Sequence, residues 1–361
     1  MKLLFVCKRH PQQRDLIERP YGRFYHLPRQ LAALGHDVRV LLCSHRKLPS
    51  LRVRSAGVEW ISGDLLTNGP YRYLQDARAE TKAFQPDWIV GLSDTYCGWL
   101  AHHLARLTHA RLAVDAYDNF EAYMPWNLPL HWLWRSAVRA AELVTAAGPE
   151  LAQKLQSHRG RGHPAEVLAM AADPEFVPLD RIACRQQLGL PQDAPLLGYI
   201  GSWTKDRGTH LLLDAFQIVR AARPDARLVL SGRPPVEALQ TPGVIGSGYV
   251  VDDQLPALVN AVDVACVITA DTGFGRYSYP AKLCEAMACG VPVAATATPA
   301  VRWMLGDRQD CMAPLNDAEA YASCLLQQLA GARTDYGPRE SWVSLALRYD
   351  ALLSSVERRK R

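Results

Sequence analysis

Residues 273–298 read GFGRYSYPAKLCEAMACGVPVAATAT and decide how the second half of this chain is interpreted. The pattern predicts a loop, a helix, a turn and a strand in succession. Pro280 suits the first turn of a helix, where a missing N–H costs nothing. Helical periodicity runs through Ala281–Ala288, and Gly290 is typical of a helix end. The apolar run Val291–Ala295 then predicts a short buried strand.

Polar groups gather around the start of this predicted helix. Ser278, Lys282 and Glu285 are spaced i, i+4 and i+7, which predicts that they share one helix face. Gly273 and Gly275 allow backbone amides to approach a ligand closely. A phosphorylated ligand with a diol fits this set, because amides and Lys282 suit phosphate and Glu285 suits hydroxyls. A solvated helix face explains the same spacing, and the residues alone leave the two interpretations balanced.

The segment resembles the nucleotide-sugar site of retaining GT-B glycosyltransferases of family 4. That family carries Glu-x7-Glu before an A-x-G-x-P-V turn, and the turn is present here as ACGVPV. Glu285 matches the second glutamate, which the resemblance assigns to the nucleotide ribose. Tyr277 stands in place of the first glutamate, so the hexose contacts are not carried over. The resemblance implies that these residues contact the donor: Phe274, Gly275, Arg276, Tyr277, Ser278, Lys282 and Glu285.

Length and composition indicate a globular protein of two domains, because 361 residues exceed what one core usually fills. Hydrophobic residues make up 48% and charged residues 21% of the chain. The net charge of +5, from 41 basic and 36 acidic residues, is too small to indicate a nucleic-acid partner. It is compatible with anionic ligands or an anionic membrane surface.

The nine cysteines are scattered without metal-ligand spacing, and their odd number argues against a disulfide framework, so we expect a reducing compartment. The apolar run in MKLLFVCKRHP is too short for a signal peptide and predicts a first strand. No stretch has the length of a membrane span. We therefore expect a cytoplasmic protein, either soluble or peripheral on the cytoplasmic face of the inner membrane.

The first half predicts a parallel α/β domain. Continuous apolar runs predict strands at Lys2–Cys7 and Val38–Cys43, with a helix at Phe24–Leu34 between them. A β-α-β unit of this kind indicates a parallel sheet with a right-handed crossover. Trp88–Leu92 and Leu112–Val114 predict two further strands.

The loop Lys8–Arg23 follows the first strand, at the edge where ligands bind in open parallel sheets. The helix after it, LPRQLAALGHDV, resembles the family pattern L-A-x-x-L-x-x-x-G-H-x-V. The resemblance therefore implies that Tyr21 and Gly22 lie beside the acceptor. Only Gly22 stands for the glycine pair that the family usually has in this loop.

Asp115, Asp118 and Glu121 cluster just after a predicted strand and form a second candidate for the acceptor side. In the family a polar residue near this place contacts the acceptor or the transferred sugar, and Asp118 is the candidate for that role. Loop capping by Asp and Asn is the alternative, and the residues favour it.

A tryptophan-rich segment follows. Trp126, Trp132 and Trp134 alternate with leucines, and Arg135 and Arg139 come after them. An apolar, tryptophan-rich face backed by arginines can lie in a membrane interface. A helix facing the core explains the same pattern, and this second interpretation is favoured.

The second domain opens with a predicted strand, Leu196–Gly201, then SWTKDRG and a helix at Thr209–Ala222. A glycine, a basic loop and a helix start at the end of a strand form a geometry that handles phosphate. The family pattern here is G-R-x-x-x-x-K-G, whose two cations hold the diphosphate. Ser202 replaces the arginine, Arg207 stands at the lysine, and Lys205 is an additional cation.

Later segments complete the resemblance. Val244–Val250 precedes DDQLP, which matches the family's G-x-V-x-x-x-x-L-P and implies that Tyr249 and Val250 lie beside the nucleobase. Ser341–Glu357 resembles the last family helix, which crosses back to the first domain. The four cations of the tail Arg358–Arg361 could touch anionic lipid.

These patterns together predict an α/β fold of the GT-B type, with two Rossmann-like parallel-sheet domains facing across a cleft. We expect an acceptor domain at 1–180 and a nucleotide-sugar domain at 181–340. Residues 341–361 should form a helix and a basic tail that pack on the first domain.

The resemblance implies a retaining glycosyltransferase that needs no metal and no cofactor, with a nucleotide-diphosphate sugar as donor. The acceptor would be a glycan, a lipid-linked or a small molecule in bacterial cell-surface polysaccharide or glycoconjugate synthesis. Negative charge builds on the diphosphate as the glycosidic bond breaks, so cations and helix-start amides there lower the barrier. Arg207, Lys282 and Asp118 are the catalytic candidates.

Two other functions remain open. A GT-B-shaped sugar-nucleotide epimerase or hydrolase would need a carboxylate or histidine at the sugar carbon in place of an acceptor loop. A nucleotide-sugar-binding protein without catalysis would explain why the motif's first glutamate and first arginine are replaced by Tyr277 and Ser202.

Overall fold

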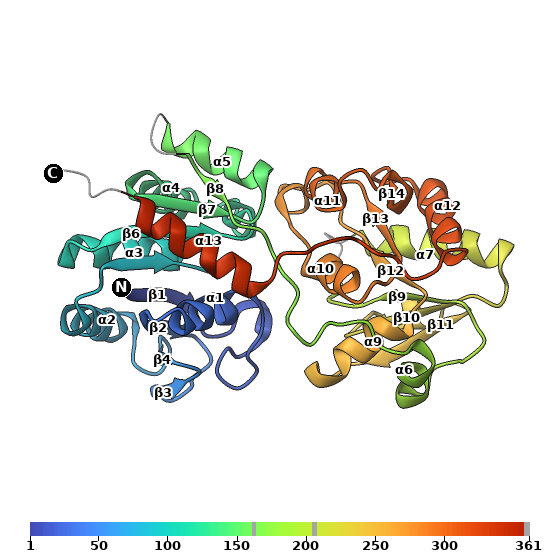
Figure 1. Ribbon diagram of the computed structural model, residues 1–361, viewed down its shortest axis with the longest axis horizontal. Helices are drawn as coiled ribbons and strands as arrows, with labels where there is room; N and C mark the ends of the chain where they lie inside the picture. The colour runs from blue at the N-terminus through green and yellow to red at the C-terminus, as the bar shows by residue number, and fades with distance from the viewer. Residues whose placement is uncertain (161–163, 204–207, 357–361) are drawn as a thin grey trace. The chain divides into compact units, whose positions relative to one another are not determined.

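The structure, a computed structural model, describes residues 1–160, 164–203 and 208–356. The chain divides into two compact units. Unit 1 comprises Met1–Met170 together with the C-terminal segment from Glu340, and unit 2 comprises Ala171–Arg339. Each unit is a mostly parallel sheet covered by helices (Figure 1). The predicted fold class, an α/β protein of two parallel-sheet domains, is confirmed.

Unit 1 contains an eight-stranded sheet with the strand order β3-β4-β2-β1-β5-β6-β7-β8. Its strands are β1 (Lys2–Lys8), β2 (Asp37–Ser44), β3 (Leu51–Ser55), β4 (Val58–Asp64), β5 (Trp88–Gly91), β6 (Arg111–Ala116), β7 (Leu143–Ala146) and β8 (Glu166–Val167). Its α-helices are α1 (Gly22–Ala33), α2 (Pro70–Phe84), α3 (Thr95–Thr108), α4 (Leu128–Ala140), α5 (Pro149–Arg159) and α13 (Trp342–Ser355). Only the edge strand β3 departs from the parallel arrangement among the described strands, since it pairs antiparallel with β4.

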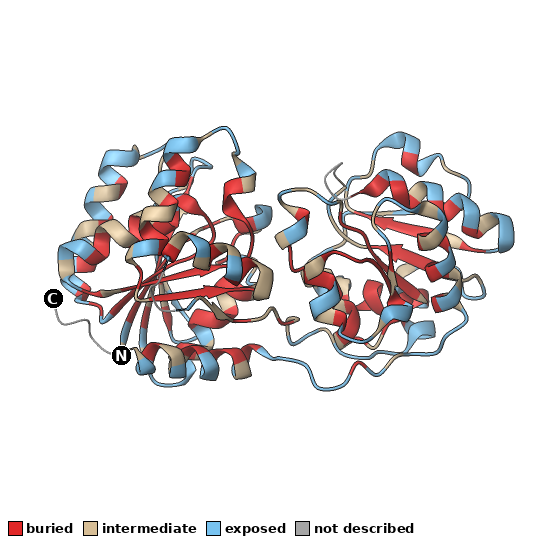
Figure 2. Ribbon diagram, turned by 90° about the horizontal axis from the view of Figure 1, so that it is seen from above, coloured by how far each residue is buried: buried red, intermediate tan, exposed pale blue. Residues whose placement is uncertain are grey.

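The centre of this sheet is buried because helices cover both of its faces. In β1 the five residues from Leu3 to Cys7 have no exposed surface, as expected for a strand covered on both sides. Helix α2 packs against α3 and α3 against α4, while α1 packs against α13. Right-handed crossovers that run in opposite directions from the middle of the sheet put these two groups on opposite faces. Figure 2 shows the buried residues concentrated along the strands.

The C-terminal helix α13 is part of unit 1. Trp342 stacks on the imidazole of His26 from α1, with ring centroids 5.7 Å apart and planes 9° apart. The Nε2 atom of His36 lies 2.9 Å from Oδ1 of Asp350. The last helix therefore covers α1 with both an aromatic and a polar contact.

Unit 2 contains a six-stranded parallel sheet with the strand order β11-β10-β9-β12-β13-β14. Its strands are β9 (Leu196–Tyr199), β10 (Arg227–Ser231), β11 (Val244–Gly248), β12 (Val264–Val267), β13 (Val293–Thr296) and β14 (Met312–Ala313). Its α-helices are α6 (Arg181–Leu188), α7 (Thr209–Ala222), α8 (Val236–Leu239), α9 (Leu255–Ala261), α10 (Ala281–Ala288), α11 (Pro299–Leu305) and α12 (Ala318–Leu329). Two apolar clusters, one on each side of the sheet, form its core.

Unit 2 begins earlier than the sequence suggested, after Met170 rather than after residue 180. The segment in question is tied to α9 through Asn260. Its side-chain Oδ1 accepts a hydrogen bond of 2.9 Å from the Leu179 amide, and its Nδ2 donates one of 3.0 Å to the Val177 carbonyl. These contacts attach the linker to unit 2 before α6 starts.

The tryptophan-rich segment is neither wholly core nor wholly surface. Trp134 is only 2% exposed and packs edge-on against Phe120, with ring centroids 5.2 Å apart. A Cβ at Gly98 would lie 2.6 Å from the Trp134 ring, so helices α3 and α4 are in close contact there. Trp126 and Trp132, in contrast, are 76% and 65% exposed. The favoured interpretation, a helix facing the core, therefore holds for Trp134, whereas Trp126 and Trp132 do not face the core.

Candidate active site

The strand order of unit 2 marks one place for a ligand. From β9 the chain continues to β10 on one side, and from the neighbouring strand β12 it continues to β13 on the other side. In open parallel sheets, ligands bind at such a switch point, outside the carboxyl ends of the strands. The two motifs that the sequence singled out, at Gly201 and at residues 273–285, directly follow β9 and β12.

Lys282 lies at this switch point. It belongs to the first turn of α10, and its Nζ atom lies 4.0 Å from the centroid of the Tyr199 ring at the end of β9. The same Nζ is 3.5 Å from the place where a Cβ on Gly201 would be. Two motifs about eighty residues apart in the chain thus meet at the edge of the sheet. This is the strongest structural feature of the candidate site.

Gly201 and Ser202 form the turn after β9. Gly201 has φ of +145°, and its amide donates a 3.2 Å hydrogen bond to Oγ of Ser231. Ser202 is exposed, and its carbonyl accepts a 2.9 Å hydrogen bond from the Tyr199 hydroxyl. The predicted cations Lys205 and Arg207 lie outside the described residues.

The loop between β12 and α10 can only form with glycine at position 275. A Cβ there would lie 2.0 Å from the carbonyl oxygen of Ala270 and 2.8 Å from Cγ2 of Thr269. The Gly275 amide donates a 2.9 Å hydrogen bond to Oγ1 of Thr272. Beside Gly275, Phe274 is half-buried. The exposed Arg276 forms an ion pair with Asp271, with 3.4 Å between Nε and Oδ1.

The helix that carries Lys282 begins later than the proposed polar face requires. Pro280 is the N-cap of α10, and Ser278 lies before the helix in extended backbone, with φ of −84° and ψ of 125°. Ser278 therefore does not share a helix face with Lys282 and Glu285, and it is buried. The other two do lie on one helix, whose opposite side packs into the core.

The remaining donor-side residues occupy different strand ends. Glu285 and Tyr277 are half-buried within the same loop and helix as Lys282. Tyr249 and Val250 follow the edge strand β11, which is separated from β9 by β10. Tyr249 is 59% exposed, whereas Val250 packs against the core. Lys282 thus lies beside Gly201, whereas Tyr249 follows a strand two positions away from β9 in the sheet.

Unit 1 has a switch point of its own, where β1 continues to β2 on one side and β5 to β6 on the other. There Lys8 forms an ion pair with Asp94, and the Ser93 hydroxyl accepts a 3.0 Å hydrogen bond from the Lys8 amide. Burial alone would lower the pKa of Lys8, but the pairing with Asp94 outweighs it and raises the pKa above its ordinary value. This pair was not predicted from the sequence, although Lys8 is the last residue of β1 and Asp94 lies shortly after β5.

The loop after β1 folds back on itself. A buried ion pair of 2.8 Å joins Nε of Arg9 to Oδ2 of Asp15. The Tyr21 hydroxyl donates a hydrogen bond to the Pro11 carbonyl, and the Arg14 guanidinium lies 4.7 Å from the Tyr21 ring centroid. Tyr21 is the N-cap of α1, and Gly22 follows with φ of +62°. Both predicted acceptor residues are half-buried at the carboxyl edge of the sheet.

Asp115 is a structural residue rather than an acceptor contact. It has no exposed surface, and it forms a bidentate ion pair with Arg23 at 2.7 and 2.6 Å. The Thr145 hydroxyl donates a further hydrogen bond to the same carboxylate. The guanidinium of Arg23 also donates to the carbonyls of Leu168 and Ala169. This cluster ties α1 to β6, β7 and the segment after β8.

Glu121 is likewise held inside unit 1. It is 7% exposed and pairs with Arg135 of α4 at 2.6 Å and with Lys154 of α5 at 3.0 Å. Nε2 of His158 lies 3.4 Å away. Burial alone would raise the pKa of Glu121, but the hydrogen bonds from these three residues outweigh it and hold the pKa well below its ordinary value. The prediction that Glu121 lies against an acceptor is therefore not supported by its position.

We expect Glu121→Gln to lower the free energy of unfolding by about 1–3 kcal/mol at neutral pH, since it removes charge from a hydrogen-bonded buried carboxylate. The lowered folded-state pKa means that this stabilisation is present above the unfolded value of about 4.3 and is lost as pH falls. The difference between wild type and variant should thus shrink between about pH 5 and pH 3. Urea unfolding at several pH values measures it. A difference that stays constant with pH contradicts the assignment.

The role of Asp118 at the acceptor or the transferred sugar stays a prediction. This residue follows β6, is 6% exposed and accepts a 2.8 Å hydrogen bond from the Tyr123 hydroxyl. The Tyr117 hydroxyl lies 3.2 Å from that of Tyr123, and burial raises the pKa of both phenols. The favoured explanation, loop capping, does not describe Asp115 and Glu121, because buried ion pairs hold both carboxylates.

Within the described residues, no group of three or more His, Cys, Asp or Glu side chains could hold a metal ion. All nine cysteines are free thiols, and all except Cys43 are buried. None of the helices in the described parts of the chain is long and apolar enough to cross a membrane.

Comparisons with known proteins show which family the chain belongs to. Residues 23–171 match the family model for the glycosyl transferase 4-like domain, and residues 194–330 match the model for glycosyl transferases group 1. Together the two matches account for most of both units. The chain belongs to the group 1 glycosyltransferases and has their two-domain GT-B fold.

Among curated proteins, the D-inositol 3-phosphate glycosyltransferase of Stackebrandtia nassauensis is 29% identical over 217 residues, 55% of this chain and 46% of that protein. The corresponding enzyme of Mycolicibacterium gilvum is 26% identical, with coverage of 75% and 61%. The chain thus spans about half the length of the first of these curated relatives.

Two solved structures share the fold. Sucrose-phosphate synthase from Thermosynechococcus elongatus matches with a TM-score of 0.73 and 17% identity, covering 99% of this chain and 94% of that one. HepE from Anabaena, in complex with UDP-glucose, matches with a TM-score of 0.73 and 16% identity, covering 98% and 100%.

Proposed function

We propose that this protein transfers a sugar from a nucleotide-diphosphate sugar to an acceptor hydroxyl, with retention at the anomeric carbon. The observation that carries the proposal is the meeting of Lys282 with the turn at Gly201, 4.0 Å from the Tyr199 ring. A cation beside a strand-end turn and a helix start suits a diphosphate. The names of the curated relatives and the UDP-glucose bound by HepE support the same reaction class.

The proposed reaction requires that the site stabilise the leaving group, which is the nucleotide diphosphate. As the glycosidic bond breaks, negative charge grows on the diphosphate, and Lys282 meets this charge without having to move. Glu285, one turn further along α10, holds the ribose hydroxyls of the donor. Arg207 supplies the second cation in this proposal. No metal and no cofactor take part, because the protein's own cations neutralise the phosphates.

The acceptor side is formed by unit 1. Asp118, with Tyr21 and Gly22 across the same edge, contacts the acceptor or the transferred sugar. The acceptor is a glycan, a lipid-linked or a small molecule of bacterial cell-surface polysaccharide or glycoconjugate synthesis. The protein acts in the cytoplasm, on the cytoplasmic face of the inner membrane, and binds no nucleic acid.

Product analysis with UDP-, GDP- and ADP-sugars tests the proposal. The purified chain is incubated with each donor and a panel of sugar and lipid-linked acceptors, with and without a chelator. We expect a glycosylated acceptor with the sugar donor of one of the three nucleotides. The product should form equally well when the chelator is present. An isomerised or hydrolysed donor would indicate an epimerase or hydrolase. Donor binding without any product would indicate the non-catalytic protein that the replacements by Tyr277 and Ser202 leave open.

A further inference from the structure

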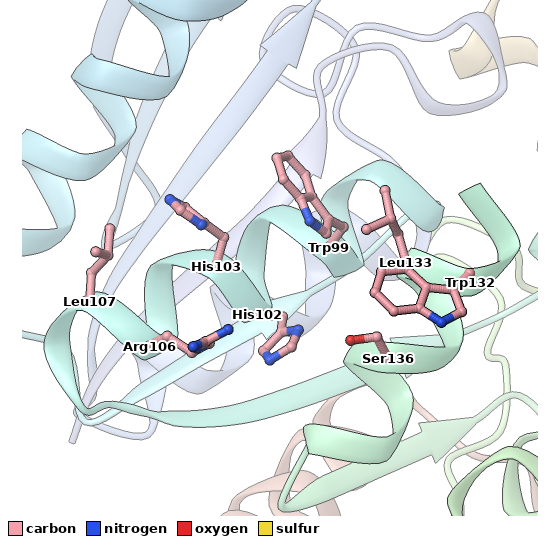
Figure 3. A pocket seen from close by; sticks show the side chains of 8 residues that line it. All are labelled: Trp99, His102, His103, Arg106, Leu107, Trp132, Leu133 and Ser136. Carbon is pink, nitrogen blue, oxygen red and sulfur yellow. The ribbon is translucent and has the colours of Figure 1, made fainter. Parts of the chain in front are cut away.

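A surface pocket of about 460 Å³ lies between helices α3 and α4 of unit 1, and the proposed reaction does not use it. Figure 3 shows its lining. The lining residues are Trp99, His102, His103, Arg106 and Leu107 from α3, and Trp132, Leu133 and Ser136 from α4. This set combines aromatic walls with imidazole and guanidinium groups and includes no acidic side chain.

The charges around the pocket are almost all positive. The sequences of α3 and α4 contain no Asp or Glu. The guanidinium of Arg78 lies 2.8 Å from Nε2 of the lining residue His103, which adds another cation nearby. The nearby carboxylate of Glu142 accepts a 2.9 Å hydrogen bond from the Leu112 amide, so it is held at a strand. A small anion would therefore be attracted to this pocket.

An apolar surface adjoins the pocket. Trp126, Leu128 and Trp132 are 76%, 69% and 65% exposed, and all three lie in or just before the first turns of α4. Exposed tryptophan and leucine beside cations are typical of protein faces that enter the headgroup region of a bilayer. Trp132 belongs to both features, because it is exposed and also lines the pocket.

We propose that this pocket binds the phosphate headgroup of an anionic phospholipid while Trp126, Leu128 and Trp132 enter the membrane interface. Arg106 and His102 donate charge-assisted hydrogen bonds to the phosphate, and Trp99 with Leu133 contacts the glycerol carbons. A free phosphate ion would use the cations but leave the apolar side chains in water. This pocket is the site through which the protein contacts the membrane named in the proposed function. Its binding of lipid does not depend on sugar transfer.

Vesicle flotation tests the site. The full chain is mixed with phosphatidylcholine vesicles that contain or lack phosphatidylglycerol. We expect binding only to the anionic vesicles, and a loss of about tenfold or more in affinity for the double variant Arg106→Gln/His102→Gln. The matched control is Arg29→Gln, which removes one exposed cation from α1 on the opposite face of the sheet. This control should bind within about twofold of wild type.

The apolar part is tested separately. Trp132→Ser should lower vesicle binding without changing the thermal unfolding midpoint, because the side chain is exposed. Brominated lipids should quench the fluorescence of wild type more than that of Trp132→Phe. Nucleotide affinity of all these variants should equal that of wild type, so failure here is distinct from failure of the transferase proposal.

Three results would overturn the site. The first is absence of wild-type binding to the anionic vesicles, including the case in which inorganic phosphate alone binds. The second is an equal loss for Arg29→Gln, which would show diffuse attraction. The third is unchanged binding by Trp132→Ser or by the pocket variant.

Discussion

Lys282→Ala should lower turnover by about thirtyfold while donor affinity falls much less. One charge-assisted contact is worth about 2 kcal/mol, and at Lys282 that contact strengthens as charge develops in the transition state. Glu285→Ala should do the reverse, since the ribose hydroxyls do not change during the reaction. Its larger effect should be on nucleotide affinity.

Initial rates and nucleotide titrations of both variants measure this contrast. Arg223→Ala serves as the control, because Arg223 is an exposed cation paired with Asp225 before β10, at the amino edge of the same sheet. It should change neither quantity. If Lys282→Ala keeps full turnover while Arg207→Ala abolishes it, Lys282 is a surface residue and the assignment to the diphosphate is wrong.

Asp115→Ala should lower the free energy of unfolding by about 3–5 kcal/mol, because it leaves the buried Arg23 without a counter-charge. The side chains of both partners are at most 1% exposed. Denaturant unfolding measures the loss. Asp76→Ala is the control, since it breaks the exposed pair with Arg72 and should cost about 0.5 kcal/mol or less.

A double variant gives the sharper test. If the cost comes from the uncompensated charge, Arg23→Met combined with Asp115→Leu should be more stable than Asp115→Ala alone. A double variant that is less stable than the single one would show that the cluster acts mainly through its hydrogen bonds to Leu168, Ala169 and Thr145.

Much of the fold could be predicted where local signals agree. The helices Thr209–Ala222 and Ala281–Ala288 have the predicted bounds, because apolar periodicity and flanking Gly or Pro mark both ends. The hairpin of β3 and β4 was missed. Its turn places Ala56 at φ of 50° before Gly57 at φ of 81°, and alanine gives no sign of a positive φ.

The site could be predicted less completely. The partners of Asp115 and Glu121 are brought to them by the tertiary fold, and Arg23 is 92 residues away from Asp115 in the chain. Spacing cannot show such a partner, so a buried ion pair and an exposed acceptor residue look alike in the sequence. Lys282 could be found because glycines, a helix start and a family motif surround it.

The chain order of unit 1 has a consequence for synthesis on the ribosome. Unit 2 is one continuous stretch and is complete once Arg339 has left the exit tunnel. Unit 1 is complete only when α13 has been synthesised, because this helix contributes the buried residues Trp342, Leu345 and Tyr349 to it. Unit 1 therefore starts to emerge before unit 2 but is completed after it, and until then the α1 surface that α13 covers stays open to water and to chaperones.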